Sequence, residues 1–166
     1  WAFVTDDLEE IVRVGLSEIP CDCRLAKAVN AVLDTYHNGT TEREERGWEL
    51  AYERLILDYG AYSPIHTLNN TAWVILALLF GDGDFDRALG LAIASGLDTG
   101  SNAASVGSVM GLLGSHTQIP DKWIAPLEDT LHTALAQVPT TRISDLAHRT
   151  ATVAEATLTN GAPAME

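Results

Sequence analysis

The sequence has few cysteines and no long apolar run. Its only cysteines are Cys21 and Cys23, and a single Cys-x-Cys pair excludes both a disulfide framework and the usual ligand spacing of structural zinc sites. The longest apolar run, Ala72 to Phe80, is less than half of the roughly 20 residues that a membrane-spanning helix needs. These absences favour a protein without membrane spans in a reducing compartment, and we expect it in the cytoplasm.

Basic residues are also scarce, and two common catalytic motifs are missing. The chain has 10 Lys and Arg against 23 Asp and Glu, which gives a formal net charge of −13. A chain this acidic has no electrostatic footprint for nucleic acid or for an anionic membrane, so neither is expected as a partner. No phosphate-binding P-loop and no Gly-x-Ser-x-Gly elbow occurs, so nothing supports catalysis by a serine or cysteine nucleophile.

Apolar residues recur at helical spacing through most of the chain, and strictly alternating runs are absent. We therefore predict an all-α fold, organised as a single domain over residues 1–166. The apolar start, Trp1 to Val4, has no initiator Met and suggests a fragment of a longer protein. A capping box of Asp6 and Glu9 would open a first helix that ends before Pro20. The further helices are expected at about residues 24–36, 41–59, 65–80, 85–94, 101–113, 127–136 and 143–158.

The loop Asp98-Thr99-Gly100-Ser101-Asn102 is the segment with the clearest chemistry. It places a carboxylate, two hydroxyls and an amide at the start of a predicted helix. Such oxygens are the ligands that a hard cation like Mg²⁺ prefers, and the amides of a helix N-terminus favour an anion such as phosphate. On spacing alone, however, Asp-x-x-Ser before a helix is also typical of an N-cap. Both interpretations stay open at this point.

The order of motifs around this loop resembles the C-terminal half of the ADP-ribosylglycohydrolase family, which includes dinitrogenase-reductase-activating glycohydrolases and J1 crystallins. The family has an Asp-Phe-x-x-Ala-Leu helix, then Asp-Thr-Asp-(Thr/Ser)-Asn, an Ala/Gly-rich helix and Ile-Pro-x-x-Trp. Further similar segments lie upstream and near the end of the chain. The matching segments are Ile19-Pro20, His66 to Asn70, Asp84 to Leu89, Asp98 to Asn102, Gly107 to Gly114, Ile119 to Trp123 and Ile143 to Ala147.

The resemblance implies a compact orthogonal multi-helix domain that lacks the family's N-terminal helices. It also implies a site for two magnesium ions, in which Asp98 and Ser101 would be metal ligands. Asn102, His66 and Asn70 would contact the substrate or shape its cleft. The implied reaction is hydrolysis of the glycosidic bond that joins ADP-ribose to a protein side chain or a small molecule, with the metal assisting the attack of water.

Two departures from the family pattern affect this expectation. Gly100 stands where the family has a second loop Asp, which removes one carboxylate and lowers divalent affinity. The family's Thr/Ser-Asp-Asp ligands belong to its N-terminal half, and Thr5-Asp6-Asp7 is better explained by helix capping. Three alternatives remain: a hydrolase completed by an N-terminal companion segment or chain, a pseudoenzyme that binds an ADP-ribose-like ligand, and a subunit that docks another chain.

Overall fold

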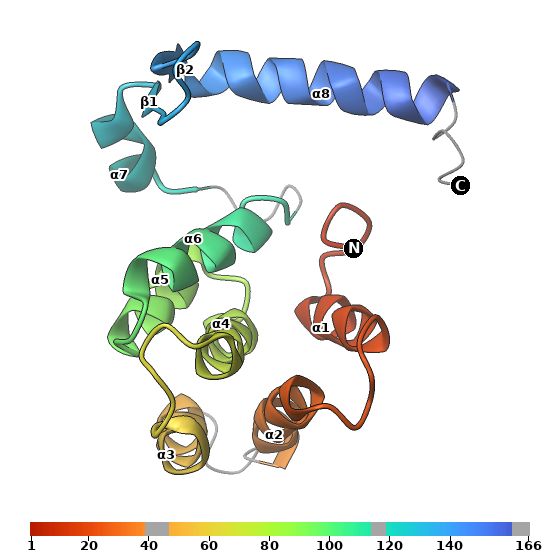
Figure 1. Cartoon of the computed structure of the whole chain (residues 1–166), viewed down its shortest axis with the longest axis vertical. Helices are drawn as coiled ribbons and strands as arrows, with labels where there is room; N and C mark the ends of the chain where they lie inside the picture. Colours follow the sequence, from red (N-terminus) through yellow and green to blue (C-terminus); the bar gives the residue numbers. More distant parts are fainter. Residues whose placement is uncertain (39–46, 114–118, 161–166) are drawn as a thin grey trace. The chain divides into compact units, whose positions relative to one another are not determined.

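A computed structural model describes residues 1–38, 47–113 and 119–160. It divides the chain into two compact units, unit 1 (Trp1–Gln118) and unit 2 (Ile119–Glu166), and each is described by itself (Figure 1). Helices dominate both, and the only sheet in the described parts has two short strands. The all-α fold class is therefore confirmed, whereas the single domain over the whole chain stays a prediction.

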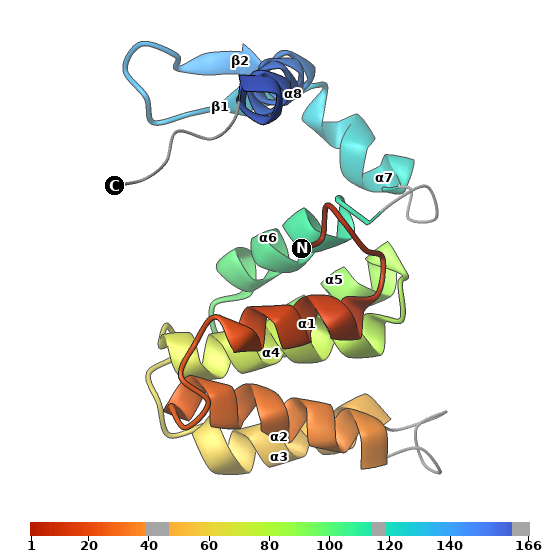
Figure 2. The ribbon, with the colours of Figure 1, turned by 90° about the vertical axis from the view of Figure 1, so that its right-hand side faces the viewer.

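Unit 1 is built around the helix α4 (Thr67–Gly81), which contains the apolar run. A helix that is apolar on all sides needs to be covered on all sides. Accordingly α4 contacts α1 (Leu8–Ser17), α2 (Arg24–Asn38), α3 (Gly47–Tyr59), α5 (Phe85–Ala94) and α6 (Thr99–Met110) (Figures 1 and 2). Trp73, Ala72 and Ala77 on α4 are fully buried at the centre of the core.

No helix within residues 1–38, 47–113 and 119–160 is both long and apolar enough to cross a membrane.

The helices of unit 1 agree with the sequence-based ranges to within a few residues. The bounds of α5 are those predicted, while α6 begins at Thr99, two residues earlier than expected. This shift matters for the candidate site, because it puts Thr99 and Gly100 in the first turn of α6 instead of in a loop. The first six residues of the helix predicted over 41–59, and Gly114 at the end of one motif, lie outside the described residues.

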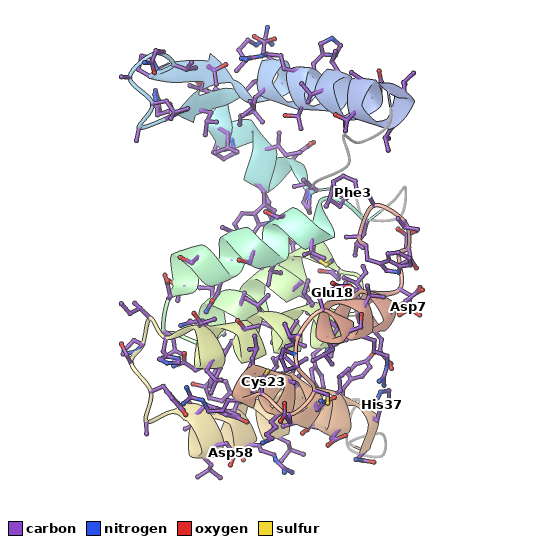
Figure 3. All side chains as sticks on the ribbon, turned by 45° about the vertical axis from the view of Figure 1, so that its right-hand side comes forward. Phe3, Asp7, Glu18, Cys23, His37 and Asp58 are labelled. Carbon is purple, nitrogen blue, oxygen red and sulfur yellow. The ribbon has the colours of Figure 1, made fainter. Side chains whose placement is uncertain are left out.

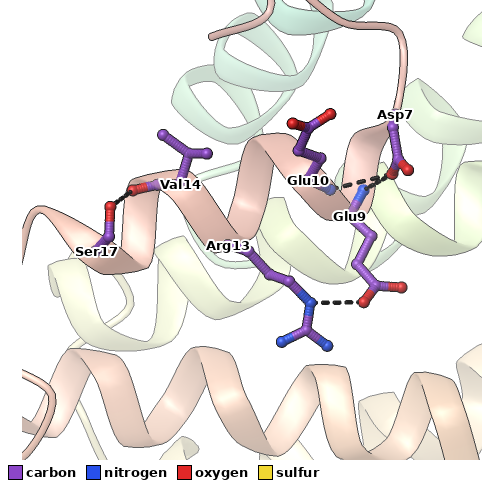
Figure 4. A pocket seen from close by; sticks show the side chains of 6 residues that line it. All are labelled: Asp7, Glu9, Glu10, Arg13, Val14 and Ser17. Carbon is purple, nitrogen blue, oxygen red and sulfur yellow. Dashed lines mark hydrogen bonds and ion pairs between the residues drawn. The ribbon is translucent and has the colours of Figure 1, made fainter.

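The N-terminus of α1 corrects one capping prediction. The cap is Asp7, not Asp6, since the Asp7 carboxylate accepts hydrogen bonds from the amides of Glu9 at 2.9 Å and Glu10 at 3.0 Å (Figure 4). The helix begins one residue later than the capping box suggested, and Asp7 has the extended backbone that a cap requires. Capping therefore accounts for the acidic pair here, as expected.

The outer face of α1 is a surface ion-pair cluster. Glu9 Oε1 accepts from Arg13 Nε at 2.6 Å and lies 3.1 Å from Nε2 of His37, at the end of α2 (Figures 3 and 4). The Arg13 hydrogen bond lowers the pKa of Glu9 most; burial opposes this in part, and the His37 and Arg13 charges add smaller lowering contributions. Exposed pairs of this kind contribute little to stability, so we assign this face no function.

Unit 2 corrects the helix predicted over residues 127–136. Instead, α7 (Asp121–Ile124) and the 3-10 turn η1 (Ala125–Leu127) lead into an antiparallel hairpin of β1 (Thr130–His132) and β2 (Thr140–Arg142), followed by α8 (Ile143–Asn160). Glu128 and Asp129 have φ angles of 47° and 52°, in the left-handed region. A helix cannot continue through two such residues.

Asp129 links the hairpin to the start of α8. Its carboxylate accepts from the Ser144 amide at 2.8 Å, the Ser144 hydroxyl at 2.6 Å and Arg142 Nε at 2.8 Å. The two Ser144 bonds and the Arg142 bond hold the pKa of Asp129 at about 2. Asp129 therefore satisfies an amide in the first turn of α8 from 15 residues upstream. Ser144 belongs to the last family-like segment of the sequence, which thus has a structural role.

We predict that this link is lost in acid. The folded pKa of Asp129 lies below its unfolded value, so its stabilisation is present above about pH 4 and disappears as the pH falls to about 2. Amide hydrogen exchange at Ser144 should accelerate over this window, after correction for intrinsic exchange rates. Asp129→Asn keeps an oxygen that can accept from the Ser144 amide but cannot titrate in this range, so exchange should be moderately faster at neutral pH and should lose this pH dependence. An equal pH dependence in wild type and Asp129→Asn would contradict the prediction.

Candidate functional site

Two asparagines join α4 to the start of α6. The Asn70 Oδ1 atom accepts a hydrogen bond from Nδ2 of Asn102 at 2.8 Å and from the backbone amide of Asp98 at 3.3 Å. Asn102 is buried, with 3% of its surface exposed, so this bond is partly shielded from water. We call Asn70 and Asn102 the amide clamp. It fixes the N-terminus of α6 against α4 across 32 residues of sequence.

The other end of the Asn70 side chain is also bonded. Its Nδ2 donates to the carbonyls of Pro64 at 2.8 Å and His66 at 2.9 Å, which belong to the turn before α4. Both polar atoms of Asn70 are thus used to hold protein segments together. The predicted contact of Asn70 with substrate stays a prediction, and the geometry gives this residue a positioning role.

Asn69 is a residue that the sequence analysis did not single out. It is fully buried, its Nδ2 donates to the Ser63 carbonyl at 3.1 Å, and its Oδ1 accepts from the Asn70 amide at 2.9 Å. A buried amide needs such partners to offset the loss of water. The sequence feature that could have indicated this role is the pair of adjacent asparagines at the start of the most apolar helix. Polar residues at such a position are explained by capping or by buried hydrogen bonds.

His66 is the N-cap of α4. Its Nδ1 accepts a hydrogen bond from the Leu68 amide at 3.1 Å, which requires the proton of the neutral ring to be on Nε2. The ring also packs against Tyr62, with 4.7 Å between ring centroids. The structure therefore gives His66 a capping role. The substrate contact stays a prediction, and only Nε2 remains to make it.

Asp98 occupies the N-cap position of α6, but its side chain makes no capping hydrogen bond. Capping therefore does not use its carboxylate. Asp98 follows Gly96 and Leu97, which have φ angles of 74° and 55°. The left-handed conformation is unfavourable for Leu97 by about 1–2 kcal/mol, and backbone strain of this kind often occurs beside functional residues.

Gly100 and Ser101 are exposed in the first turn of α6, next to Asp98. A Cβ atom built on Gly100 would meet no heavy atom within 4 Å, and Gly100 does not have a positive φ. Neither space nor backbone conformation thus requires glycine here. Ser101 lies three residues after Asp98, so both side chains belong to the same end of the helix.

These residues match magnesium chemistry only in part. Asp98 and Ser101 supply one carboxylate and one hydroxyl, which suit a hard cation. The described part of the chain contains no group of three or more His, Cys, Asp or Glu side chains that could hold a metal ion. The residues present could therefore supply some of the ligands of one cation, and they are too few for a site that holds two ions.

The candidate site brings most of its predicted members together. Hydrogen bonds connect Asn70 with His66, Asp98 and Asn102. Ser101 is placed in the adjoining helical turn, where its carbonyl accepts from Ser105 Oγ at 2.9 Å. The amide clamp holds the N-terminus of α6 against α4. Next to the clamp, this N-terminus carries the Asp98 carboxylate, which makes no capping hydrogen bond, and the Ser101 hydroxyl. Chemically, it can bind a cation through oxygen and orient a polar ligand.

The comparisons with known proteins give one match. The family model described as ADP-ribosylglycohydrolase matches residues 1–160, nearly the entire chain. No curated protein and no solved structure matches the chain. The family match covers the amide clamp, the Asp98–Asn102 segment and the Asp129–Ser144 link alike. The chain therefore belongs to the ADP-ribosylglycohydrolase family.

Proposed function

We propose that this protein takes part in magnesium-dependent hydrolysis of the glycosidic bond between ADP-ribose and a protein side chain or small molecule. The observation that carries the proposal is the Asp98 carboxylate, which helix capping does not use and which the amide clamp positions through the Asp98 backbone. On this proposal Asp98 and Ser101 are ligands of a magnesium ion. A bound magnesium would polarise the oxygens of water or of the ribose.

The reaction itself is a simple exchange of bonds. The bond between the anomeric carbon and the nitrogen or oxygen of the acceptor breaks, and a bond from that carbon to a water oxygen forms. One proton of the water passes to the leaving group. The remaining ligands would come from a companion segment or chain, because the described residues offer too few carboxylates.

The second candidate is a protein that binds an ADP-ribose-like ligand without hydrolysing it. Gly100 favours this interpretation, since it provides no side chain at the position where the family has an Asp. The two candidates share the ligand and differ in the reaction. Binding and product release therefore have to be measured separately.

The test uses the full chain, ADP-ribose and an ADP-ribosylated peptide. We expect ADP-ribose binding, measured by calorimetry, to be at least about tenfold tighter with Mg²⁺ than with a chelator. Asp98→Asn should lose this magnesium-dependent gain but leave the melting temperature unchanged, since the carboxylate makes no capping bond. The exposed Asp58→Asn on α3 is the matched control and should bind as wild type does.

Release of ADP-ribose from the peptide, followed by chromatography, then distinguishes the candidates. Release that requires Mg²⁺ and Asp98 supports the hydrolase. Binding without release excludes hydrolysis by this chain alone, which supports the second candidate unless a companion segment or chain restores release. If wild type shows neither binding nor release, both candidates are wrong and the family fold serves another purpose here.

A further inference from the structure

A largely apolar cavity lies between α1, α2, α4 and α6 of unit 1 and is partly open to solvent, since Gly15 and Ser105 in its lining are exposed. Its volume is about 300 Å³, and it adjoins the candidate site through Ser105, whose hydroxyl donates to the Ser101 carbonyl. Among the residues that line it are Ile11, Gly15, Ile19, Val29, Ile75 and Val109. Ligand-binding pockets begin at about this size and are mostly apolar, with a few polar groups that orient the ligand.

The cavity exists because a large side chain is missing from α1. Ile11 and Gly15 are one turn apart on the same face of α1, and Ile19 follows just after the end of the helix; all three line the cavity. A Cβ atom at Gly15 would meet no heavy atom within 4 Å. Gly15 also has no positive φ that would require glycine, and glycine weakens a helix interior. The backbone conformation of α1 therefore does not require a glycine at position 15, and the space beside it could accept a larger side chain.

The lining determines what could bind. None of its residues is charged, so a phosphate or carboxylate would find no countercharge there and would lose part of its hydration, which disfavours anionic ligands. Two lining residues carry hydroxyls, Thr71 and Ser105. The Ser105 hydroxyl donates to the Ser101 carbonyl at 2.9 Å, so its oxygen is left as an acceptor. A ligand with one hydrogen-bond donor complements this arrangement.

The volume sets the size of the ligand. A sealed apolar cavity of about 150 Å³ holds one benzene ring, so a cavity of twice this volume has room for about two fused rings. We propose that this cavity is a binding site for a neutral, mostly apolar molecule of about that size with a single hydrogen-bond donor. The charged ADP-ribose group does not fit this description, so the site is distinct from the one proposed above.

Indole is a suitable probe, since it is neutral, has two fused rings and carries one N–H donor. Titration of the full chain with indole should give saturable shifts of the Ile11, Ile75 and Val109 methyl resonances in NMR spectra. We expect a Kd of about 1 mM or below, as for other small neutral ligands. Indole-3-carboxylate should bind at least about tenfold more weakly, because its charge would lose water in the cavity.

The decisive variant is Gly15→Leu, whose side chain would occupy the hollow. It should weaken indole binding at least about tenfold and raise the melting temperature, since leucine is a better helix former than glycine. Gly90→Leu is the matched control, because Gly90 is exposed on α5 and does not line the cavity. A Cβ atom at Gly90 would also meet no heavy atom within 4 Å. This variant should bind indole as wild type does.

The outcomes separate clearly. Loss of binding in Gly15→Leu but not in Gly90→Leu supports the proposal. If Gly15→Leu does not fold, the smaller Gly15→Ala should still weaken binding by a few fold. The proposal is overturned if wild type shows no saturable shifts up to about 10 mM indole, or if both leucine variants bind equally. ADP-ribose should leave the indole titration unchanged, which keeps this test independent of the proposed function.

Discussion

Replacing Asn70 by alanine is expected to lower the free energy of unfolding of unit 1 by about 2–4 kcal/mol. The change removes the acceptor of Asn102 Nδ2, which is buried and would be left without this partner. It also removes the donor to the carbonyls of Pro64 and His66. An unsatisfied buried polar group costs about 1–3 kcal/mol, and each further lost hydrogen bond about 1 kcal/mol, so the sum is large for a single substitution. Urea unfolding followed by tryptophan fluorescence measures it, since unit 1 contains the buried Trp73.

Asn30→Ala is the matched control, because Asn30 is an exposed asparagine on α2. It should change stability by no more than about 0.5 kcal/mol. A double-mutant cycle with Asn102→Ala isolates the clamp, since contacting residues show coupling energies of about 0.5–3 kcal/mol. If Asn70→Ala were as mild as Asn30→Ala, or if the effects of Asn70→Ala and Asn102→Ala simply added, the clamp would have no energetic importance.

The sequence predicted unit 1 well because local signals and burial agree there. The apolar run of α4 can be satisfied only by a helix covered on all sides, and the capping aspartate Asp84 fixes the start of α5 through a 2.7 Å bond to the Arg87 amide. Such signals act within a few residues. They therefore place helix ends to within a turn without knowledge of the fold.

The same signals failed in unit 2. Strands of three residues are too short to show a period of two, and the left-handed φ angles of Glu128 and Asp129 are uncommon for these residues. The partner of the first turn of α8 is Asp129, which lies 15 residues before Ser144 in the sequence. A cap supplied from that distance depends on the hairpin, so no local pattern indicates it.

The candidate site lies between these cases. The motifs pointed to Asn70, Asp98 and Asn102 as members of one site, and the structure joins them by hydrogen bonds. The motifs did not indicate how the Asn70 side chain is used. It donates a hydrogen bond to the turn before α4 and accepts one from the side-chain amide of Asn102. They also could not distinguish an Asp98 that caps α6 from one whose carboxylate is unused by capping.

The second large effect concerns Gly100. Gly100→Asp is expected to tighten Mg²⁺ binding by at least about tenfold, since a carboxylate about 4 Å from a divalent cation contributes about 2 kcal/mol even at the dielectric constant of water. A Cβ atom at this position meets no heavy atom within 4 Å, and an acidic residue in the first helical turn is favoured by the helix dipole. Stability should therefore be unchanged or slightly higher, and the gain in affinity would not reflect a change in folding. Calorimetric titration of the full chain with MgCl₂ measures it.

Two variants make the result specific to the site. Gly90→Asp adds the same charge at another exposed glycine with open space, on α5 and away from Asp98, so any gain from net charge alone appears there too. The double variant Asp98→Asn/Gly100→Asp has the wild-type number of carboxylates and should lose most of the gain, because both are expected to bind the same ion. Equal Mg²⁺ affinity in Gly100→Asp and Gly90→Asp would rule out a cation site at the start of α6. A gain confined to Gly100→Asp would instead show that this end of the helix has the geometry for metal binding, and that the carboxylate missing at Gly100 is one of the factors that limit its affinity.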